Sequence, residues 1–261
     1  MSESERNRYI QALEENMAAK FSFLPSLSSA MDVDTANDML IVNSHLRSDI
    51  FNIVWQTTTD DLTKLRIPIV MFKTENLPFA WWTGFSKEPA LLRERLITLG
   101  LECTEHEIGM GRSLINLPDT KPIPGLNINT VESSEAMQDF ISVLTKQMPN
   151  EADPITTFYQ STQQHVFKSD SPLQLFVGYL NRKPVATGAW FGHHNAIGVW
   201  DIVTLPEVRG QGIASSMVLY ALHQGRLLGY RIGVLSANDA GQHVYKKLGF
   251  ESLRDMFIYN V

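Results

Sequence analysis

The chain has 261 residues, 44% of them hydrophobic and 19% charged, and its formal net charge is −6. This composition excludes an intrinsically disordered chain, and it supplies no broad positive surface, so we expect no nucleic-acid partner. No run of about 18 apolar residues occurs, so we expect no membrane-spanning helix and no membrane partner.

The cysteine content and the N-terminus bear on the compartment. Cys103 is the only cysteine, so no internal disulfide can form, and we expect its side chain to be a small buried hydrophobe. The opening MSESERNRYIQALEEN lacks the apolar core of a signal peptide. We therefore expect a cytoplasmic protein, either a monomer or a homodimer.

The first elements are read from composition and spacing. The polar segment from Ser4 to Lys20 predicts an exposed amphipathic helix. From Met39 to Trp82, short apolar runs separated by Asn, Thr, Asp and Pro predict strands and turns more than long helices. A helix is predicted from Glu88 to Leu99, with Gly100 as its C-terminal cap.

A proline-rich segment, LPDTKPIPGL at residues 117–126, follows these elements. It holds three prolines and a glycine and shows neither helical nor strand periodicity. We interpret it as a boundary between an N-terminal α/β domain, residues 1–120, and a C-terminal domain, residues 125–261.

The C-terminal part alternates clear helices and strands. A helix is predicted from Ser133 to Met148, a second helix ends near Phe167, and three strand-like runs follow: LQLFVGYL, PVATGAWF and AIGVWDIVTL. Turns at 181–183 and 193–195 predict an antiparallel meander. Helix, strand, helix and strand then fill 212–259, which predicts an α+β (mixed α/β) fold and not a doubly wound one.

The segment from Val203 to Ser215 lies between a predicted strand and a predicted helix. Gly210 and Gly212 let a ligand approach the backbone, and the N–H groups that open the helix favour phosphate. A simple turn remains an alternative for the glycines alone. No Gly-Lys-Ser/Thr follows them, and Ser215 replaces the third glycine of a dinucleotide fingerprint, so both of those nucleotide motifs fail.

Two motifs resemble those of the GCN5-related N-acetyltransferase (GNAT) superfamily. Arg209 to Ala214 matches its Arg/Gln-x-x-Gly-x-Gly/Ala signature, and Asn238 to Phe250 resembles its Asn-x-x-Ala-x-x-Leu-Tyr-x-x-x-Gly-Phe segment, with Gly241 and Val244 as departures. From Asn127 to the C-terminus, the order of elements also agrees. The resemblance implies an acyl-CoA N-acyltransferase fold, with a mostly antiparallel sheet flanked by helices.

The resemblance implies acetyl-CoA as co-substrate. Backbone contacts to pantetheine would fall on Val203 and Thr204. The pyrophosphate site and the further cofactor contact of the second motif would fall on Arg209, Gly210, Gln211, Gly212, Ile213, Ala214, Ser215 and Asn238.

The resemblance also implies that Tyr245 donates a proton or hydrogen bond to the CoA sulfur, with simple packing of this ring as the alternative. The general base is less defined, because residues 196–200 contain no carboxylate. Asp201 is the nearest acid and the candidate base. The alternatives are the turn histidines His193 and His194, a water chain, or an amine that is already neutral and needs no base. Neighbours on a strand point to opposite faces, and no ligand set is complete, so we expect no metal.

The N-terminal half lacks the glycine signature. Its segment PFAWWTG, residues 78–84, resembles the N-terminal region of some two-domain acetyltransferases, which is a degenerate copy of the fold in some cases. Trp81 and Trp82 alternate along a strand, so one is expected in the core and the other towards a pocket or partner domain, with core packing of both as the alternative. We expect this half to shape the acceptor site and not to bind CoA.

The predicted function is therefore N-acetyl transfer from acetyl-CoA to a primary amine of a small molecule or peptide, by direct attack on the thioester. The alternative is an acyl-CoA-binding sensor or an inactive pseudoenzyme, suggested by the missing strand glutamate. A nucleotide-binding module is disfavoured by the failed motifs.

Overall fold

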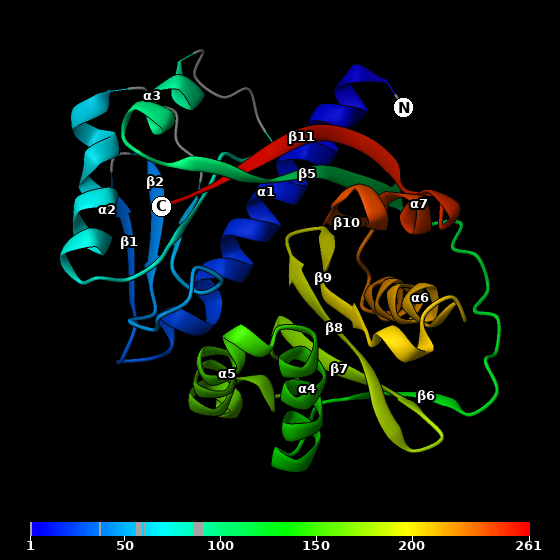
Figure 1. The fold of residues 1–261 in the computed structure, drawn as a ribbon. Helices are drawn as coiled ribbons and strands as arrows, with labels where there is room; N and C mark the ends of the chain where they lie inside the picture. The colour runs from blue at the N-terminus through cyan, green and yellow to red at the C-terminus, as the bar shows by residue number, and fades with distance from the viewer. Residues whose placement is uncertain (1, 37, 56–58, 60, 86–90) are drawn as a thin grey trace.

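A computed structural model describes the chain except for residues 1, 37, 56–58, 60 and 86–90 (Figure 1). The helices are α1 (Glu3–Ser26), α2 (Leu62–Thr74), α3 (Leu92–Thr98), α4 (Ser134–Gln147), η1 (Pro149–Glu151), α5 (Ala152–Val166), η2 (Pro206–Val208), α6 (Ile213–Leu227) and α7 (Asp239–Lys247). The strands are β1 (Asp32–Ala36), β2 (Met39–Asn43), β3 (Ile53–Trp55), β4 (Ala80–Trp82), β5 (Glu102–Ser113), β6 (Leu126–Thr130), β7 (Leu173–Leu180), β8 (Lys183–His193), β9 (Ala196–Thr204), β10 (Ile232–Ala237) and β11 (Glu251–Asn260).

One continuous sheet joins the two halves of the chain. Its strand order is β1-β2-β3-β4-β11-β5-β10-β9-β8-β7-β6. Strand β5 precedes the proline-rich segment, yet it pairs antiparallel with β10 and with β11 of the C-terminal half. The connection from β5 to β6 then runs outside α7 and α6 (green in Figure 1). The division into residues 1–120 and 125–261 stays a prediction. β5 belongs to the first of these ranges, but it pairs with strands of the second.

The predicted meander is confirmed. β7, β8 and β9 pair antiparallel in chain order, and Asn181 and Arg182 take the left-handed backbone conformation that the first tight turn requires. β10 lies parallel to β9, and helices flank the sheet. This mixed arrangement confirms the predicted fold class.

Three hydrophobic cores cover the two faces of the sheet. α1, α4 and α5 pack on one face, whereas α6 covers the opposite face of β8 and β9. α2 and α3 cover that opposite face over β2, β3 and β4. Because side chains alternate along β4, fully buried Trp81 lies in the core under α2 and α3, and Trp82 lies on the other face.

Helix α1 departs from the predicted exposed helix. It extends to Ser26 and crosses the middle of the molecule (Figure 1), where Leu13 and Asn16 are fully buried. The Asn16 amide donates to the carbonyl oxygens of Phe191 (2.8 Å) and Ala196 (3.4 Å), and its oxygen accepts from Trp200 Nε1 (3.0 Å). Composition alone misled because a polar side chain can be buried when it has hydrogen-bond partners.

Other local predictions were wrong or only partly testable. Residues 67–72, expected to be a strand, lie in α2, because Leu65, Ile69 and Phe72 form a buried stripe at helical spacing behind the N-cap Asp61. Cys103 is exposed on β5 and not buried. The helix expected at 88–99 is observed as α3, and the start of that expected range lies outside the described residues.

Candidate active site

Strands β9 and β10 separate at the centre of the sheet. Their pairing runs from Ala196 with Ile232 to Gly198 with Val234, and no described residue continues it. Beyond that point β9 carries a register shift against β8, and Asp201 has φ 54°. An irregularity of this kind bends a strand and increases its twist, which opens the sheet beside β9.

A cavity of about 360 Å³, which we call the donor-side cavity, occupies this opening. Its walls come from α1, β4, β5, β9, the end of β10 and α7 with its N-cap residue. Among its lining residues are four of the predicted site: Asp201, Val203, Asn238 and Tyr245. The Asn238 side chain caps α7 by accepting from the Gly241 N–H at 3.0 Å, which fixes the helix that carries Tyr245.

The glycine loop after β9 ends at the N-terminus of α6. Gly210 (φ 77°) and Gly212 (φ 81°) both have left-handed backbone conformations, which explains why glycine stands at each position. Gly212 is the N-cap of α6, no side chain caps this helix, and its first turn contains no acid. The N–H groups of Ile213, Ala214 and Ser215 therefore open the helix without a side-chain cap, which is the arrangement that favours anions at helix N-termini.

Arg209 and Gln211, the non-glycine residues beside Gly210, are both exposed, and Arg209 makes two hydrogen bonds. Exposed Arg209 donates from Nε to the Thr204 carbonyl at 2.9 Å and from Nη2 to Gln147 Oε1 at 2.8 Å. Its guanidinium thereby braces the loop against the end of β9 and against α4, and it keeps its positive charge near the loop. Gln211 is exposed beside it.

Tyr245 shares the donor-side cavity with Glu107 of β5. Burial, followed by the negative charge of Glu107, raises the pKa of Tyr245 to about 12. Burial also raises the pKa of Glu107 itself. The sequence reasoning missed Glu107, because β5 reaches this site only through pairing with strands more than 100 residues away. Its one signal was the alternation of acids at Glu105 and Glu107, ahead of an apolar run.

Asp201 contacts a cation and faces a phenol. Its Oδ1 lies 3.3 Å from Lys20 Nζ of α1. Burial, and then the charge of Asp201, raise the pKa of Tyr159 well above its ordinary value. His193 and His194 are not among the described residues that line the cavity, and their rings are 4.2 Å apart, so they do not diverge as predicted. The left-handed backbone of His194 at the turn breaks the strand alternation behind that prediction.

A second cavity of about 330 Å³, which we call the acceptor-side cavity, lies between the two halves of the chain. Its lining comes from α1, the segment before β3, β3, β4, β5, α4, α5, β7, β9 and β11. Five residues line both cavities: Lys20, Phe21, Trp82, Asp201 and Val203. We call these five residues the junction, because the two cavities meet there.

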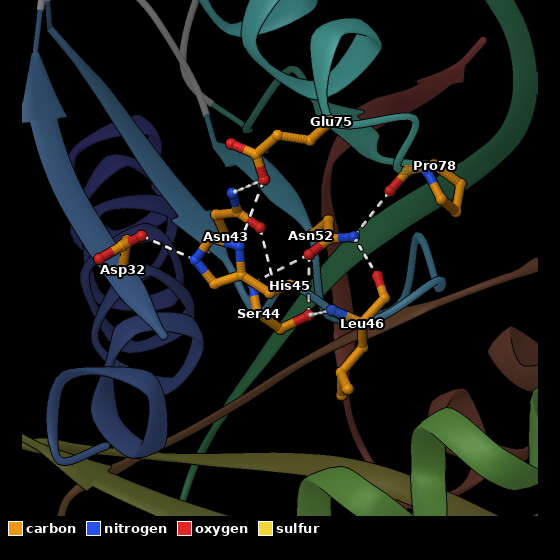
Figure 2. Close-up of polar contacts among 8 residues, drawn as sticks. All are labelled: Asp32, Asn43, Ser44, His45, Leu46, Asn52, Glu75 and Pro78. Atoms are coloured by element: carbon orange, nitrogen blue, oxygen red, sulfur yellow. Dashed lines mark hydrogen bonds and ion pairs between the residues drawn. The ribbon is translucent and has the colours of Figure 1, made fainter. Parts of the chain in front are cut away.

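A buried polar network holds one wall of the acceptor-side cavity. Asn52 is fully buried; its amide donates to the carbonyls of Leu46 (2.7 Å) and Pro78 (2.8 Å), and its oxygen accepts from the backbone and side chain of Ser44 (Figure 2). These bonds tie residues 44–52, which carry cavity-lining Asp49 and Phe51, to the segment that leads into β4. The wall is therefore fixed before any ligand arrives.

Several unpaired polar atoms lie at or near the junction. Among the described residues, seven buried side-chain N or O atoms have no hydrogen-bond partner. Four of them belong to the junction or to residues beside it: Trp82 Nε1, Glu107 Oε2, Asp201 Oδ2 and Thr204 Oγ1. The other three are on Trp81, Glu151 and Ser252. A buried polar atom without a partner costs about 1–3 kcal/mol, so such atoms are rare unless something else satisfies them. Their grouping here indicates a site that binds a polar ligand.

Comparison with known proteins agrees with this geometry. Residues 137–250 match the sequence model of the acetyltransferase (GNAT) family. The C-terminal half carries a GNAT acetyltransferase domain. Family and fold imply transfer of an acyl group from an acyl-CoA. No curated protein matches the sequence.

Solved structures share the fold over nearly the full length. A GCN5-related N-acetyltransferase from Kribbella flavida has a TM-score of 0.67 at 14% identity, over 94% of this chain and 95% of that one. A conserved protein of unknown function from Staphylococcus epidermidis ATCC 12228 has a TM-score of 0.63 at 17% identity, over 85% of this chain and 90% of that one. A tandem GNAT protein from the clavulanic acid biosynthesis pathway has a TM-score of 0.61 at 10% identity, over 100% of this chain and 95% of that one. At such identities the likeness concerns the fold alone.

Neither a metal-binding cluster nor a membrane-spanning helix occurs in the described part of the chain. No group of three or more His, Cys, Asp or Glu side chains there is arranged to hold a metal ion. None of the described helices is both long and apolar enough to cross a membrane.

Proposed function

We propose that the GNAT domain transfers an acetyl group from acetyl-CoA to a primary amine of a small molecule or peptide, in the cytoplasm, by direct attack of the amine on the thioester. The observation that carries this proposal is the junction, where two cavities meet beside Asp201 and Val203 and within the same cavity as Tyr245. One cavity suits the acyl donor and the other suits the acceptor.

The donor is assigned to the side of β9 that β10 leaves open. Pantetheine would pair with the backbone of Val203 and Thr204, and its pyrophosphate would bind at Arg209 to Ser215, where helix N–H groups and one guanidinium favour negative charge. Asn238 would position α7 at the cavity wall. The unpaired N–H groups of β9 would stabilise the oxyanion that forms on the thioester carbonyl.

The reaction needs one proton removed from the amine and one delivered to the thiolate. Asp201 would accept the first, a role supported by its position in the lining of both cavities, and Glu107 is a second carboxylate in the lining of the donor-side cavity. Tyr245, with a pKa of about 12, stays protonated at neutral pH and can donate a hydrogen bond to the departing sulfur. Either carboxylate could act as the general base in place of the glutamate that is missing from residues 196–200.

The test is thiol release from acetyl-CoA across a panel of primary amines. We expect amine-dependent release that falls at least about tenfold in kcat/KM for Asp201→Asn, because the base and the partner of Lys20 are both lost. The matched control is Asp255→Asn, on the exposed face of β11, which is expected to change the rate less than about twofold. Binding of acetyl-CoA without release from any amine would instead support a sensor.

A further inference from the structure

The acceptor-side cavity has the size of a small-molecule site. Its volume of about 330 Å³ lies near the lower end of the roughly 300–1,000 Å³ typical of ligand cavities. Both halves of the chain contribute walls, and Asn52 fixes the wall that carries Asp49 and Phe51 (Figure 2). A rigid cavity of this size holds one small molecule more readily than a peptide segment.

The body of the cavity is apolar. Phe51 stacks on Phe158, with ring centroids 4.1 Å apart and planes 12° from parallel, and Phe21 meets Trp82 edge-on at 5.3 Å. Leu144 of α4 and neighbouring aliphatic side chains complete the surface. A polar or charged ligand body would lose its hydration here without gaining partners, whereas an apolar body gains by burial.

The charges on the lining are unequal. Asp49, Glu105 and Asp201 line the cavity, and Lys20 is the one cation among the described lining residues. Lys20 pairs with Asp201, so Asp49 and Glu105 leave an excess of negative charge. The Asn260 amide donates to Asp49 and holds that carboxylate in place. Such a cavity attracts an ammonium group and repels a carboxylate.

Resting on the acetyl transfer proposed above, we propose that the acceptor is a small primary amine with an uncharged, apolar body, such as an arylalkylamine. Its nitrogen lies at the junction beside Asp201, and its body occupies the acceptor-side cavity. Amino acids are disfavoured by the negative charge, and amino sugars by the apolar walls.

The decisive comparison uses two amines that differ by one carboxylate, 2-phenylethylamine and L-phenylalanine. We expect kcat/KM to be at least about a hundredfold higher for 2-phenylethylamine, with L-phenylalaninamide, which lacks the negative charge, in between. Glucosamine is expected to fall near L-phenylalanine, because its hydroxyl groups lose hydration against the apolar walls. Calorimetric titration of each amine into the protein saturated with CoA measures acceptor binding independently of turnover.

Two sets of variants connect this preference to the cavity. Leu144→Phe should lower kcat/KM about tenfold for 2-phenylethylamine and less than about twofold for ethylamine, because the larger ring fills the cavity. Its control is Leu219→Phe, an equally buried position on α6 outside the described lining of the cavity, which should affect both amines alike. The double variant Asp49→Asn, Glu105→Gln should narrow the 2-phenylethylamine to L-phenylalanine ratio by about tenfold.

Equal or faster turnover of L-phenylalanine or glucosamine would overturn the inference while leaving acetyl transfer intact. An equal effect of Leu144→Phe on both amines would also overturn it. If the protein–CoA complex binds 2-phenylethylamine and not L-phenylalanine, yet no amine releases thiol, the acceptor class stands and the proposed transfer fails. Binding of neither amine, with release from another class, refutes the acceptor class.

Discussion

The predicted contacts to the donor and the two cavities that meet at the junction are built in different ways. The predicted contacts to the donor come from two short segments, residues 203–215 and 238–245, each continuous in the chain. The walls of both cavities are drawn from distant parts: the donor-side lining runs from Met17 to Tyr245, and the acceptor-side lining runs from Lys20 to Asn260. The predicted contacts to a common cofactor are therefore local in sequence, whereas the space around both ligands is assembled from distant elements.

Helix α1 connects the two cavities. Lys20 and Phe21 line both, and upstream of them Asn16 ties the helix to β8 and β9. A Cβ atom at Gly198 would lie 2.0 Å from Asn16 Oδ1, so glycine is required there for the helix to approach the strand. The comparison between the cavities can therefore be tested at α1 first.

The largest expected effect is that of Asn16→Leu. Leucine is close in volume, but it leaves the Phe191 carbonyl and Trp200 Nε1 buried without partners, so we expect the free energy of unfolding to fall by about 3 kcal/mol. Urea denaturation measures this loss. The control is Gln11→Leu, exposed on the same helix, which should change stability by less than about 0.5 kcal/mol. Equal losses in both variants would show that Asn16 does not anchor α1.

Gly212→Glu is expected to have the next largest effect, confined to the donor side. It forces a side chain into a left-handed conformation and puts a carboxylate at the proposed pyrophosphate site, so acetyl-CoA binding should weaken by about a hundredfold. Calorimetry gives the dissociation constant. Gly229→Glu is a matched control, because Gly229 has φ 94° after the opposite end of α6. If Gly229→Glu weakened acetyl-CoA binding to a similar extent, the glycine loop would not be part of the binding site.

Tyr245→Phe is expected to act on turnover and not on donor binding. We expect kcat to fall about tenfold or more, with the dissociation constant of acetyl-CoA changed less than about twofold. Because the pKa of Tyr245 is raised to about 12, the advantage of the wild type should persist past pH 10 and decline only as the phenol ionises. Tyr220→Phe, on α6 outside the described lining of both cavities, is the control. An unchanged kcat would leave Tyr245 with a packing role.

The smallest expected effect tests the link between β5 and α7. The charge of Glu107 raises the pKa of Tyr245, so Glu107→Gln should lower that pKa towards its ordinary value. The tyrosines are titrated spectroscopically in the wild type and in Glu107→Gln. Subtracting the titration curve of the same protein with Tyr245→Phe isolates the signal of the Tyr245 hydroxyl. Glu102→Gln, at the exposed start of the same strand, should leave the titration unchanged. No shift in the Glu107 variant would mean that the two side chains do not interact.

The order of elements in the C-terminal half and the position of the glycine loop could be predicted from the sequence alone. This was possible because the apolar spacing of α4 and α6, the turns between β7, β8 and β9, and the left-handed glycines are all properties of neighbouring residues. The predicted order of helix, strand, helix and strand across 212–259 likewise located the helix that carries Tyr245.

The rest of the site depends on contacts that form only when distant parts of the chain fold together. Lys20 meets Asp201 across 181 positions of the chain, and Glu107 reaches the cavity of Tyr245 because β5 inserts between β10 and β11. Asn16 is polar, yet it is buried by its partners on β8 and β9. Contacts of this kind depend on strand pairing and on the burial of satisfied polar groups, and neither leaves a periodic pattern in the sequence.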